Sequence, residues 1–371
     1  MNWTFWLGIV SPHLSELVRA LASIPGQTVT VVADHEPADE RKAIGWRVAD
    51  CSPASVLIKP HPTVVEQLIC QSDDRKSVHL LGGLPNITLN RQVLFRLART
   101  KATVGLISES ADNRGVLGFA RQAKYRTDRY FVEPHLHFIL AMGQLGVRWF
   151  ESVGYNSLHI YPFMYVTERP LMGSRAASEA HASQGLRMLY LGQLIRRKDC
   201  LTLFRSLQDF AGHPWTLDIV GSGPELKRWQ RASETIDLGA RIRFSPAIDN
   251  RSIGFLLDHT DLLLLPSRWD GWGAVVNEAL MCGVPVICSD NCGAADLLRE
   301  PWRGQIFKAG SVESLRHVLR GWIERGKRSD DFSARIRQWS AVLEGQQAAH
   351  YLIDIVVYLH NGGIRPSPPW Y

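Results

Sequence analysis

Short apolar runs alternate with amphipathic stretches along this chain, and the alternation occurs in both halves. In the first half the candidate strands are Trp3–Val10, Thr28–Ala33, Ser55–Lys59, Ser77–Leu81, Thr103–Ile107 and His137–Met142. Between the first two, Leu14, Leu17, Val18 and Leu21 repeat at the spacing of one helix face. Strands that alternate with helices at this spacing predict a parallel sheet covered by helices on both faces.

The second half repeats this architecture without repeating the sequence. Its candidate strands are Arg187–Leu191, Thr216–Val220, Ile242–Phe244, Leu262–Leu265 and Val284–Cys288. Helical stretches such as Leu201–Phe210 and Val275–Met281 lie between them. We therefore expect an α/β protein with two doubly wound, Rossmann-like domains. Such domains bind ligands at the carboxyl ends of their strands, and we expect these ends to face each other across a cleft.

The length of 371 residues is consistent with two domains. A small, polar stretch at 173–185 is typical of an exposed linker. We therefore expect a first domain over residues 1–165 and a second over 166–345. A last helix and an irregular tail should span 346–371 and pack back on the first domain.

Charge and cysteine content limit the class of protein. The net charge of +6 permits an anionic partner such as a nucleic acid, a phosphorylated small molecule or a membrane surface, but no nucleic-acid-binding module is recognisable. No run of about 20 apolar residues predicts a membrane span, and the first ten residues indicate a buried strand rather than a signal peptide. The six cysteines form no CxxC pair, which favours reduced core thiols in a cytoplasmic protein; they are Cys51, Cys70, Cys200, Cys282, Cys288 and Cys292.

The segment after the apolar strand Leu262–Leu265 has the residues of a ligand-binding turn. Gly271 and Gly273 allow the backbone to approach a ligand closely. The N–H groups at the start of the following helix favour an anion such as phosphate. Asp270 and Glu278 are eight residues apart, which places one in the loop and the other in the helix. Without further context, a helix-capping Asp and a solvated Glu explain this pair equally well.

This segment resembles the signature of the retaining glycosyltransferases of family 4, which have the GT-B fold. Their pattern is Glu-Gly-Phe-Gly…Glu-Ala…Cys-Gly-x-Pro-Val-Val, with seven residues between the two acids. Here it reads Asp270-Gly271-Trp272-Gly273…Glu278-Ala279-Leu280-Met281-Cys282-Gly283-Val284-Pro285-Val286-Ile287. The resemblance implies that Asp270 holds sugar hydroxyls of the donor and Glu278 its ribose. An Asp at the first position is one methylene shorter than the usual Glu.

Two further segments agree, and the resemblance covers roughly residues 186–310. The stretch from Gly192 to Asp199 resembles the family's Gly-Arg-Leu…Lys-Gly segment, whose Arg and Lys neutralise the donor diphosphate. Lys198 matches that Lys, whereas Gln193 stands at the Arg position, so Arg196 or Arg197 is a candidate for the missing charge. Without the resemblance, the run would be interpreted as a solvated loop. Gly221-Ser222-Gly223 matches the family's glycine turn near the nucleotide.

The resemblance implies transfer of a sugar from a nucleotide-sugar to a hydroxyl acceptor, with retention at the anomeric carbon. No dedicated nucleophile is established in this family, and front-face attack is the usual proposal. Lys198 and Asp270 are then the catalytic candidates, through positioning and charge stabilisation. Donor-binding candidates are Gln193, Arg197, Gly221, Gly223, Gly271, Trp272, Gly273 and Glu278. No Asp-x-Asp motif or metal-spaced His/Cys cluster appears, so neither a metal nor another cofactor is expected.

The family and the basic charge suggest cell-surface polysaccharide or lipopolysaccharide assembly at the inner face of the membrane. The departures at Gln193 and Asp270 leave open a non-catalytic partner of another transferase that still binds a nucleotide-sugar. A nucleotide-dependent oxidoreductase would need a Gly-x-Gly-x-x-Gly turn after the first strand, where Ser11-Pro12-His13 stands instead.

The first half matches the family only in architecture, so its site residues are candidates from position. His13, His79 and Glu109 lie near predicted strand ends, where they could contact the acceptor or serve a structural role. In the segment Arg114–Phe131, five basic residues interleave with apolar ones. This pattern is compatible with contact with an anionic membrane near a lipid-linked acceptor. The alternative is a helix that covers part of the first sheet.

Overall fold

The computed structural model describes residues 1–37, 49–72, 74–83, 88–173 and 185–371. The chain forms two compact units, one from Met1–Glu168 with Glu344–Tyr371 and one from Arg169–Leu343. The chain thus leaves the first unit after Glu168 and returns to it at Glu344. Most of the predicted linker, residues 174–184, lies outside the described residues.

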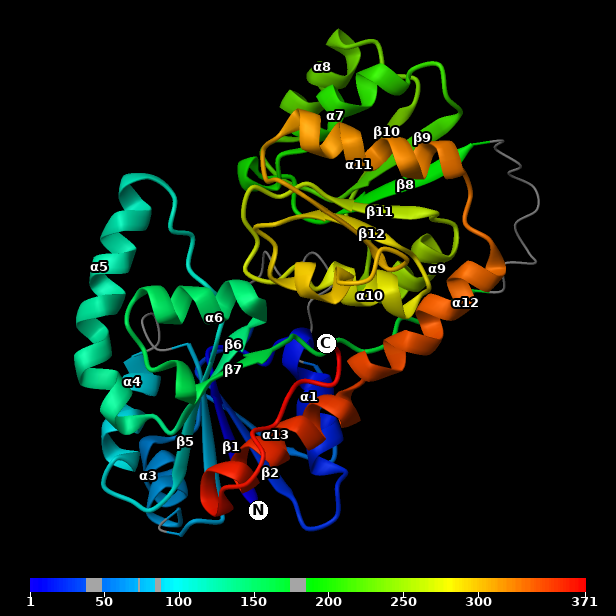
Figure 1. Cartoon of the computed structure of the whole chain (residues 1–371). Helices are drawn as coiled ribbons and strands as arrows, with labels where there is room; N and C mark the ends of the chain where they lie inside the picture. Colours follow the sequence, from blue (N-terminus) through cyan, green and yellow to red (C-terminus); the bar gives the residue numbers. More distant parts are fainter. Residues whose placement is uncertain (38–48, 73, 84–87, 174–184) are drawn as a thin grey trace. The chain divides into compact units, whose positions relative to one another are not determined.

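Parallel strands in the order β3-β2-β1-β4-β5-β6-β7 form the sheet of the first unit (Figure 1). The strands are β1 (Asn2–Leu7), β2 (Thr28–Ala33), β3 (Ser55–Ile58), β4 (Ser77–Gly82), β5 (Thr103–Ser108), β6 (Phe138–Met142) and β7 (Ile160–Phe163). Their side chains are buried on both faces at the centre, where Trp3, Phe5 and Trp6 are each almost fully buried. Continuous apolar runs of this kind are typical of parallel strands with helices on both sides.

Helices cover this sheet, and the last of them comes from the end of the chain. They are α1 (Pro12–Ala22), α3 (Pro62–Cys70), α4 (Thr88–Leu97), α5 (Gly115–Val132), α6 (Gly143–Ser152) and α13 (Gly345–Asn361). α1 begins as the sequence predicts, because the Ser11 side chain caps it and Pro12 occupies its first turn. Its apolar face is buried, and α13 packs against it (Figure 1).

The second unit has the same design with one strand fewer. Its parallel sheet has the order β10-β9-β8-β11-β12-β13. The strands are β8 (Leu186–Leu191), β9 (Trp215–Val220), β10 (Ile242–Ser245), β11 (Leu262–Leu265), β12 (Val286–Ser289) and β13 (Gly304–Phe307). The helices are α7 (Cys200–Leu207), α8 (Leu226–Thr235), α9 (Ile253–Asp258), α10 (Val275–Met281), α11 (Val312–Arg325) and α12 (Asp330–Trp339).

The two sheets confirm the predicted α/β architecture, with local corrections. β7 and β13 were not predicted, because both are short edge strands and one contains a proline. β1 ends at Leu7 rather than Val10, since the chain then turns toward the Ser11 cap. Five of the six free cysteines are buried as expected, whereas Cys70 is exposed at the end of α3. No helix of the described residues is long and apolar enough to cross a bilayer.

Candidate functional site

Two loops meet where the strand order of the second sheet reverses. β8 and β11 are neighbours there, and the segments that follow them run from Gly192 to Asp199 and from Pro266 to Ala274. The loop backbones are joined directly, because the N–H of Arg268 donates to the carbonyl of Arg197 at 2.8 Å. Open α/β sheets bind ligands at the carboxyl ends of strands at such a reversal. Position alone therefore makes these loops the candidate site of this unit.

A carboxylate and two cations occupy the centre of this site. Lys198 closes the short helix η4 (Arg196–Lys198), and its Nζ donates to Oδ2 of Asp270. The Nη1 of Arg197 lies 3.5 Å from Oδ1 of Asp270 and donates to the carbonyl of Trp269 at 3.2 Å. The hydroxyl of Ser267 donates to Oδ2 at 3.4 Å. Both carboxylate oxygens are therefore engaged, at a residue only 7% exposed.

The charges of this trio depend on one another. Burial raises the pKa of the Asp270 carboxyl, but the Lys198 and Arg197 cations outweigh burial and hold that pKa below its ordinary value. Asp270 is therefore ionised at neutral pH, and the trio carries a net charge of about +1. A buried ion left without its partner costs several kcal/mol. The site therefore favours a ligand whose negative charge can share these cations.

Neighbouring backbone holds Asp270 in place. Its N–H donates to the carbonyl of Asn291 at 2.8 Å, and its own carbonyl accepts from the N–H of Gly293 at 3.1 Å. The Sγ of Cys292 donates to the carbonyl of Trp272 at 2.8 Å. The segment after β12 therefore clamps the loop that carries Asp270.

A second ion pair braces the same two loops and was not predicted. The Nε of Arg268 donates to Oδ2 of Asp199 at 2.8 Å, and Asp199 has a left-handed backbone with φ +50°. That conformation is uncommon for a residue other than glycine. The only signal in the sequence was position, since both residues follow strands at the reversal.

The glycines of this site allow close packing of the backbone, and their contact with a donor stays a prediction. A Cβ at Gly221 would lie 1.9 Å from the carbonyl oxygen of Gly192, and one at Gly223 would lie 2.3 Å from that of Leu194. Both glycines also have φ near +155°. They therefore let the loops after β8 and β9 pack together, which needs no nucleotide. Gly293 has the same kind of role, because a Cβ there would lie 2.3 Å from the carbonyl oxygen of Gly271, which is itself buried.

The remaining predicted donor residues separate into two groups. Trp272 is a core residue, because its ring is 1% exposed and its Nε1 donates to Oδ1 of Asn277 at 2.8 Å. Its ring is therefore part of the core, and donor binding by the backbone of Gly271–Gly273 stays a prediction. Gln193 is exposed and Gly273 is half-buried, with φ +94°. Glu278 is half-buried in α10, and burial raises the pKa of its carboxyl to about 7. Among the ion pairs of the described ranges, none includes Glu278.

Comparison with known proteins identifies this unit. Residues 175–339 match the family model described as glycosyl transferases group 1. The second unit is a group 1 glycosyltransferase domain. A solved structure of HepE from Anabaena, in complex with UDP, covers 96% of this chain and 100% of its own, with a TM-score of 0.73 at 14% identity. The whole chain therefore has the GT-B fold of its structural neighbours.

Curated relatives match over part of this chain. A 2-deoxystreptamine N-acetyl-D-glucosaminyltransferase of Niallia circulans is 28% identical over 34% of this chain and 33% of its own. A GDP-mannose-dependent phosphatidylinositol monomannoside mannosyltransferase of Mycolicibacterium smegmatis is 25% identical over 40% and 42%. The Vi polysaccharide biosynthesis protein VipC/TviE of Salmonella typhi is 32% identical over 29% and 18%. The matched stretch thus spans less than half the length of each relative.

The acceptor-side candidates lie in the unit outside the transferase domain, and one of them is misplaced. His79 is in the middle of β4 rather than at its end and is fully buried. Its Nδ1 accepts from Nε1 of Trp6 at 3.0 Å, and burial lowers its pKa to about 4. It is therefore a core residue that cannot contact an acceptor. Because β4 is buried on both faces, its sequence has no alternation of polar and apolar residues that could have identified His79 as a core residue.

The other two candidates lie at the carboxyl edge of the first sheet. His13 is in the first turn of α1, and its ring stacks on Tyr165 with centroids 5.3 Å apart. Glu109 directly follows β5 and is half-buried. The two residues follow different strands, β1 and β5, which are separated in the sheet by β4.

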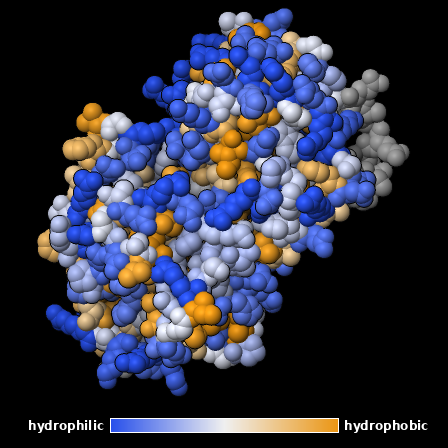
Figure 2. Space-filling model, in the orientation of Figure 1, coloured by the Kyte–Doolittle hydropathy of each residue, from blue (hydrophilic) through white to orange (hydrophobic). Residues whose placement is uncertain are grey.

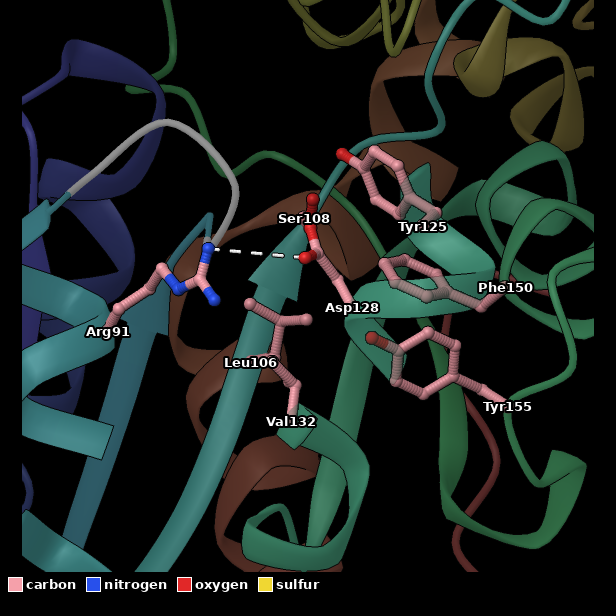
Figure 3. A pocket seen from close by; sticks show the side chains of 8 residues that line it. All are labelled: Arg91, Leu106, Ser108, Tyr125, Asp128, Val132, Phe150 and Tyr155. Carbon is pink, nitrogen blue, oxygen red and sulfur yellow. Dashed lines mark ion pairs between the residues drawn. The ribbon is translucent and has the colours of Figure 1, made fainter. Parts of the chain in front are cut away.

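A small hollow opens beside the end of β5, beneath α5 (Figure 3). Arg91 of α4 lies opposite Asp128 of α5, with Nη1 and Oδ1 4.0 Å apart, and Ser108 ends the strand between them. Tyr125 and Tyr155 close the other side. The cavity of about 10 Å³ holds no more than about one water. As it stands, this hollow is too small for a sugar.

Proposed function

We propose that this protein is a retaining glycosyltransferase that moves a sugar from a nucleotide-sugar to a hydroxyl of a cell-surface glycan or its lipid-linked precursor. The observation that carries the proposal is the trio of Lys198, Arg197 and Asp270 at the reversal of a group 1 glycosyltransferase domain. The proposal is supported by relatives whose names specify sugar transfer or polysaccharide biosynthesis. The bound UDP in the HepE structure supports a nucleotide-sugar donor.

The trio is suited to the charge that develops on a leaving diphosphate. In front-face transfer the bond from the anomeric carbon to the diphosphate oxygen breaks while the acceptor oxygen bonds to the same face. The acceptor proton passes to the departing phosphate oxygen. Lys198 and Arg197 stabilise that diphosphate, which requires them to release part of their hold on Asp270. The freed carboxylate then accepts from a hydroxyl of the transferred sugar. Neither a metal nor another cofactor has a part in this scheme.

A donor panel tests the proposal. Purified protein is mixed with UDP-, GDP-, ADP- and dTDP-sugars, and the thermal shift and nucleotide release are recorded. We expect one donor to raise the melting temperature, and the shift to be lost in Lys198→Ala and weakened in Arg197→Ala. Arg196→Ala is the matched control, because Arg196 is an exposed neighbour on the same short helix. A panel in which no donor or nucleotide stabilises the protein contradicts the proposal.

The second candidate function is a nucleotide-sugar-binding partner without transfer activity. It is favoured by Gln193 and Asp270, which stand where the family that this chain resembles has Arg and Glu. The double variant Gln193→Arg/Asp270→Glu separates the two functions. A large gain in transfer over the wild type supports a decayed site, whereas unchanged or lower transfer supports an active site adapted to Asp270 and Arg197.

For the setting, we propose the cytoplasmic face of an anionic membrane, with α5 as the contact. Val116, Ala120, Ala123, Thr127 and Tyr130 recur on the outward side of this helix, and all are exposed. Val116, Leu117 and Phe119 are 70–86% exposed. Hydrophobic residues are visible on the side of the surface where Figure 1 shows α5 (Figure 2). Exposed Lys124 and Arg126 flank the stripe. An apolar outer face with flanking cations suits the interface of an anionic bilayer, and the mannosyltransferase relative is named for a lipid acceptor.

Vesicle sedimentation tests the setting. We expect the protein to sediment with phosphatidylglycerol vesicles and much less with phosphatidylcholine vesicles. The variant Leu117→Ser/Phe119→Ser should lose most of this binding. Leu158→Ser is the control, because Leu158 is 67% exposed in the same unit but away from α5. Equal sedimentation of both variants would exclude α5 as the contact.

A further inference from the structure

The transferase domain has a groove of about 530 Å³ that is separate from the trio. Asp261, which directly precedes β11, and Trp302, which lies two residues before β13, both line it. The groove therefore lies at the amino ends of these strands, whereas the trio lies at the carboxyl ends. The corner between α11 and α12 forms its other wall, from Trp322 to Phe332.

Arginine side chains lie flat on aromatic rings at this groove. The guanidinium carbon of Arg325 is 4.7 Å from the ring centroid of Trp322 and 5.5 Å from that of Phe332. The guanidinium of Arg335, at the edge of the groove, is 4.4 Å from the centroid of Trp302. Stacking of this kind fixes the plane of a guanidinium and leaves the N–H groups at its edge available for an anion.

These cations have no acidic partner. No ion pair among the described residues includes Arg325, Lys327 or Arg335, and all three are exposed. Arg328 has a different role, because its buried guanidinium donates to main-chain carbonyls of 257–260 and 283 and ties the corner together. Two of these cations, Arg325 and Lys327, line the groove, and cations without an ion-pair partner favour a negatively charged ligand.

The floor of the groove adds a polar group that a ligand can satisfy. Asp261 is 1% exposed, and its Oδ2 accepts from the backbone N–H of Arg187 at 2.9 Å. Its Oδ1 has no hydrogen-bond partner. Buried carboxylate oxygens are rarely left unpaired, so a hydroxyl group in the groove would supply a missing donor.

We propose that this groove binds an acidic oligosaccharide, one that carries carboxylate or phosphate groups. Guanidinium edges bind such groups through paired hydrogen bonds, aromatic walls pack against the apolar faces of sugar rings, and Asp261 accepts from a sugar hydroxyl. The volume matches a ligand larger than a single ion. That the ligand is a glycan rests on the proposed function, since a transferase that extends a polysaccharide acts beside such a chain.

The proposal makes the groove a holding site for the growing chain, away from the chemistry. Loss of the groove should therefore raise the KM for long acidic acceptors and leave kcat and the donor KM unchanged. Short acceptors, which cannot reach from the trio to the opposite edge of the sheet, should show no change in KM.

Direct binding is the first test. The full-length protein is titrated with trigalacturonate, with a phosphorylated maltotriose, with neutral maltotriose and with inorganic phosphate, and tryptophan fluorescence is followed. We expect saturable binding of one acidic trisaccharide at least tenfold tighter than that of maltotriose or phosphate. The two acidic ligands distinguish carboxylate from phosphate recognition. Equal binding of neutral maltotriose, or phosphate as tight as the trisaccharides, would overturn the proposal, as would no saturable binding.

Variants locate the binding. Arg325→Ala and the exposed-residue variant Lys327→Glu should each weaken the acidic trisaccharide about tenfold. Arg320→Ala is the control, because Arg320 is an exposed arginine of the same helix outside the groove. The thermal shift caused by the nucleotide-sugar should be the same in all of them. If the nucleotide-sugar raises the melting temperature of the wild type but no trisaccharide binds, only the groove proposal is rejected. If the nucleotide-sugar does not raise the melting temperature of the wild type, the proposed function is rejected.

Discussion

The two sheets of this protein share one strand order and differ in what lies at their centres. In each, the first strand of the unit pairs with the second and the fourth, counted within that unit. In the first unit, beside β1, the polar group is His79, which is fully buried and bonded to Trp6. In the second, the loops beyond β8 and β11 hold three charged side chains in contact. The same architecture thus provides a closed core in one unit and a charged site in the other, because function lies in loops added to a fold.

The largest expected effect comes from removing the central cation of the second unit. Lys198→Ala should lower kcat/KM by about 10²–10³-fold, because the leaving diphosphate loses a buried positive charge. It should also destabilise the protein by about 3 kcal/mol, since Asp270 keeps its charge with less compensation. Initial rates and urea unfolding measure the two losses.

Two variants sharpen this result. Lys198→Ala/Asp270→Ala should recover much of the stability and none of the activity, because the uncompensated carboxylate is gone while the diphosphate still lacks its cation. Arg91→Ala removes a cation at the end of the first sheet and should leave the donor KM unchanged. If Arg91→Ala raised the donor KM as much as Lys198→Ala, the charged donor site would not be a property of the second unit alone.

The sequence predicted the strands and the site residues better than the contacts between them. Apolar runs such as Thr28–Ala33 and Leu262–Leu265 match the observed strands residue for residue. Lys198 and Asp270 were both predicted, but they are 72 positions apart in the sequence, which hides the fact that they form a pair. Pairing of this kind depends on strand order, which local periodicity does not determine. Strand order also explains why Arg197, and not Arg196, is the second cation beside Asp270.

Residues with several possible roles were the least predictable. Gly221 and Gly223 were predicted near a nucleotide, and the fold adds that both allow two loops to pack together. Trp272 belongs to a family motif and is a core residue here, because only the fold shows where its ring points. His79 lies in a strand buried on both faces, where alternation cannot separate core from surface.

Alanine at Gly223 tests whether loop packing distinguishes the two units. The new Cβ would lie 2.3 Å from the carbonyl of Leu194, at a φ of +155°. We expect a loss of about 2–3 kcal/mol in the free energy of unfolding. Gly26→Ala in the first unit is the control, since it has φ +79° and no atom within 4 Å of the new Cβ. It should lose only about 1 kcal/mol. Equal losses of unfolding free energy in Gly223→Ala and Gly26→Ala would mean that backbone strain, not loop packing, causes the destabilisation.

Glu278 makes the second unit sensitive to rising pH. Its pKa of about 7 lies above the ordinary value of 4.5, so the folded state binds this proton more tightly than the unfolded state. The stability that the protonated carboxyl contributes is therefore lost as pH rises from about 4.5 through 7. Glu278→Gln should be more stable than the wild type by about 2 kcal/mol at pH 8 and nearly equal to it at pH 4.5. Unfolding without donor at several pH values measures the difference; a gap that stays constant with pH contradicts the assignment.

His79 makes the first unit sensitive to pH in the opposite direction. Its pKa of about 4 lies below the ordinary value of 6.5, because the buried ring binds a proton poorly. The unfolded state takes up that proton first, so stability falls as pH decreases from about 6.5 toward 4. His79→Asn keeps an acceptor near Nε1 of Trp6 and cannot titrate. The loss in the free energy of unfolding that this substitution causes should be about 2 kcal/mol smaller at pH 5 than at pH 8. A cost that is the same at both pH values would mean that burial of His79 does not set the acid sensitivity of this unit.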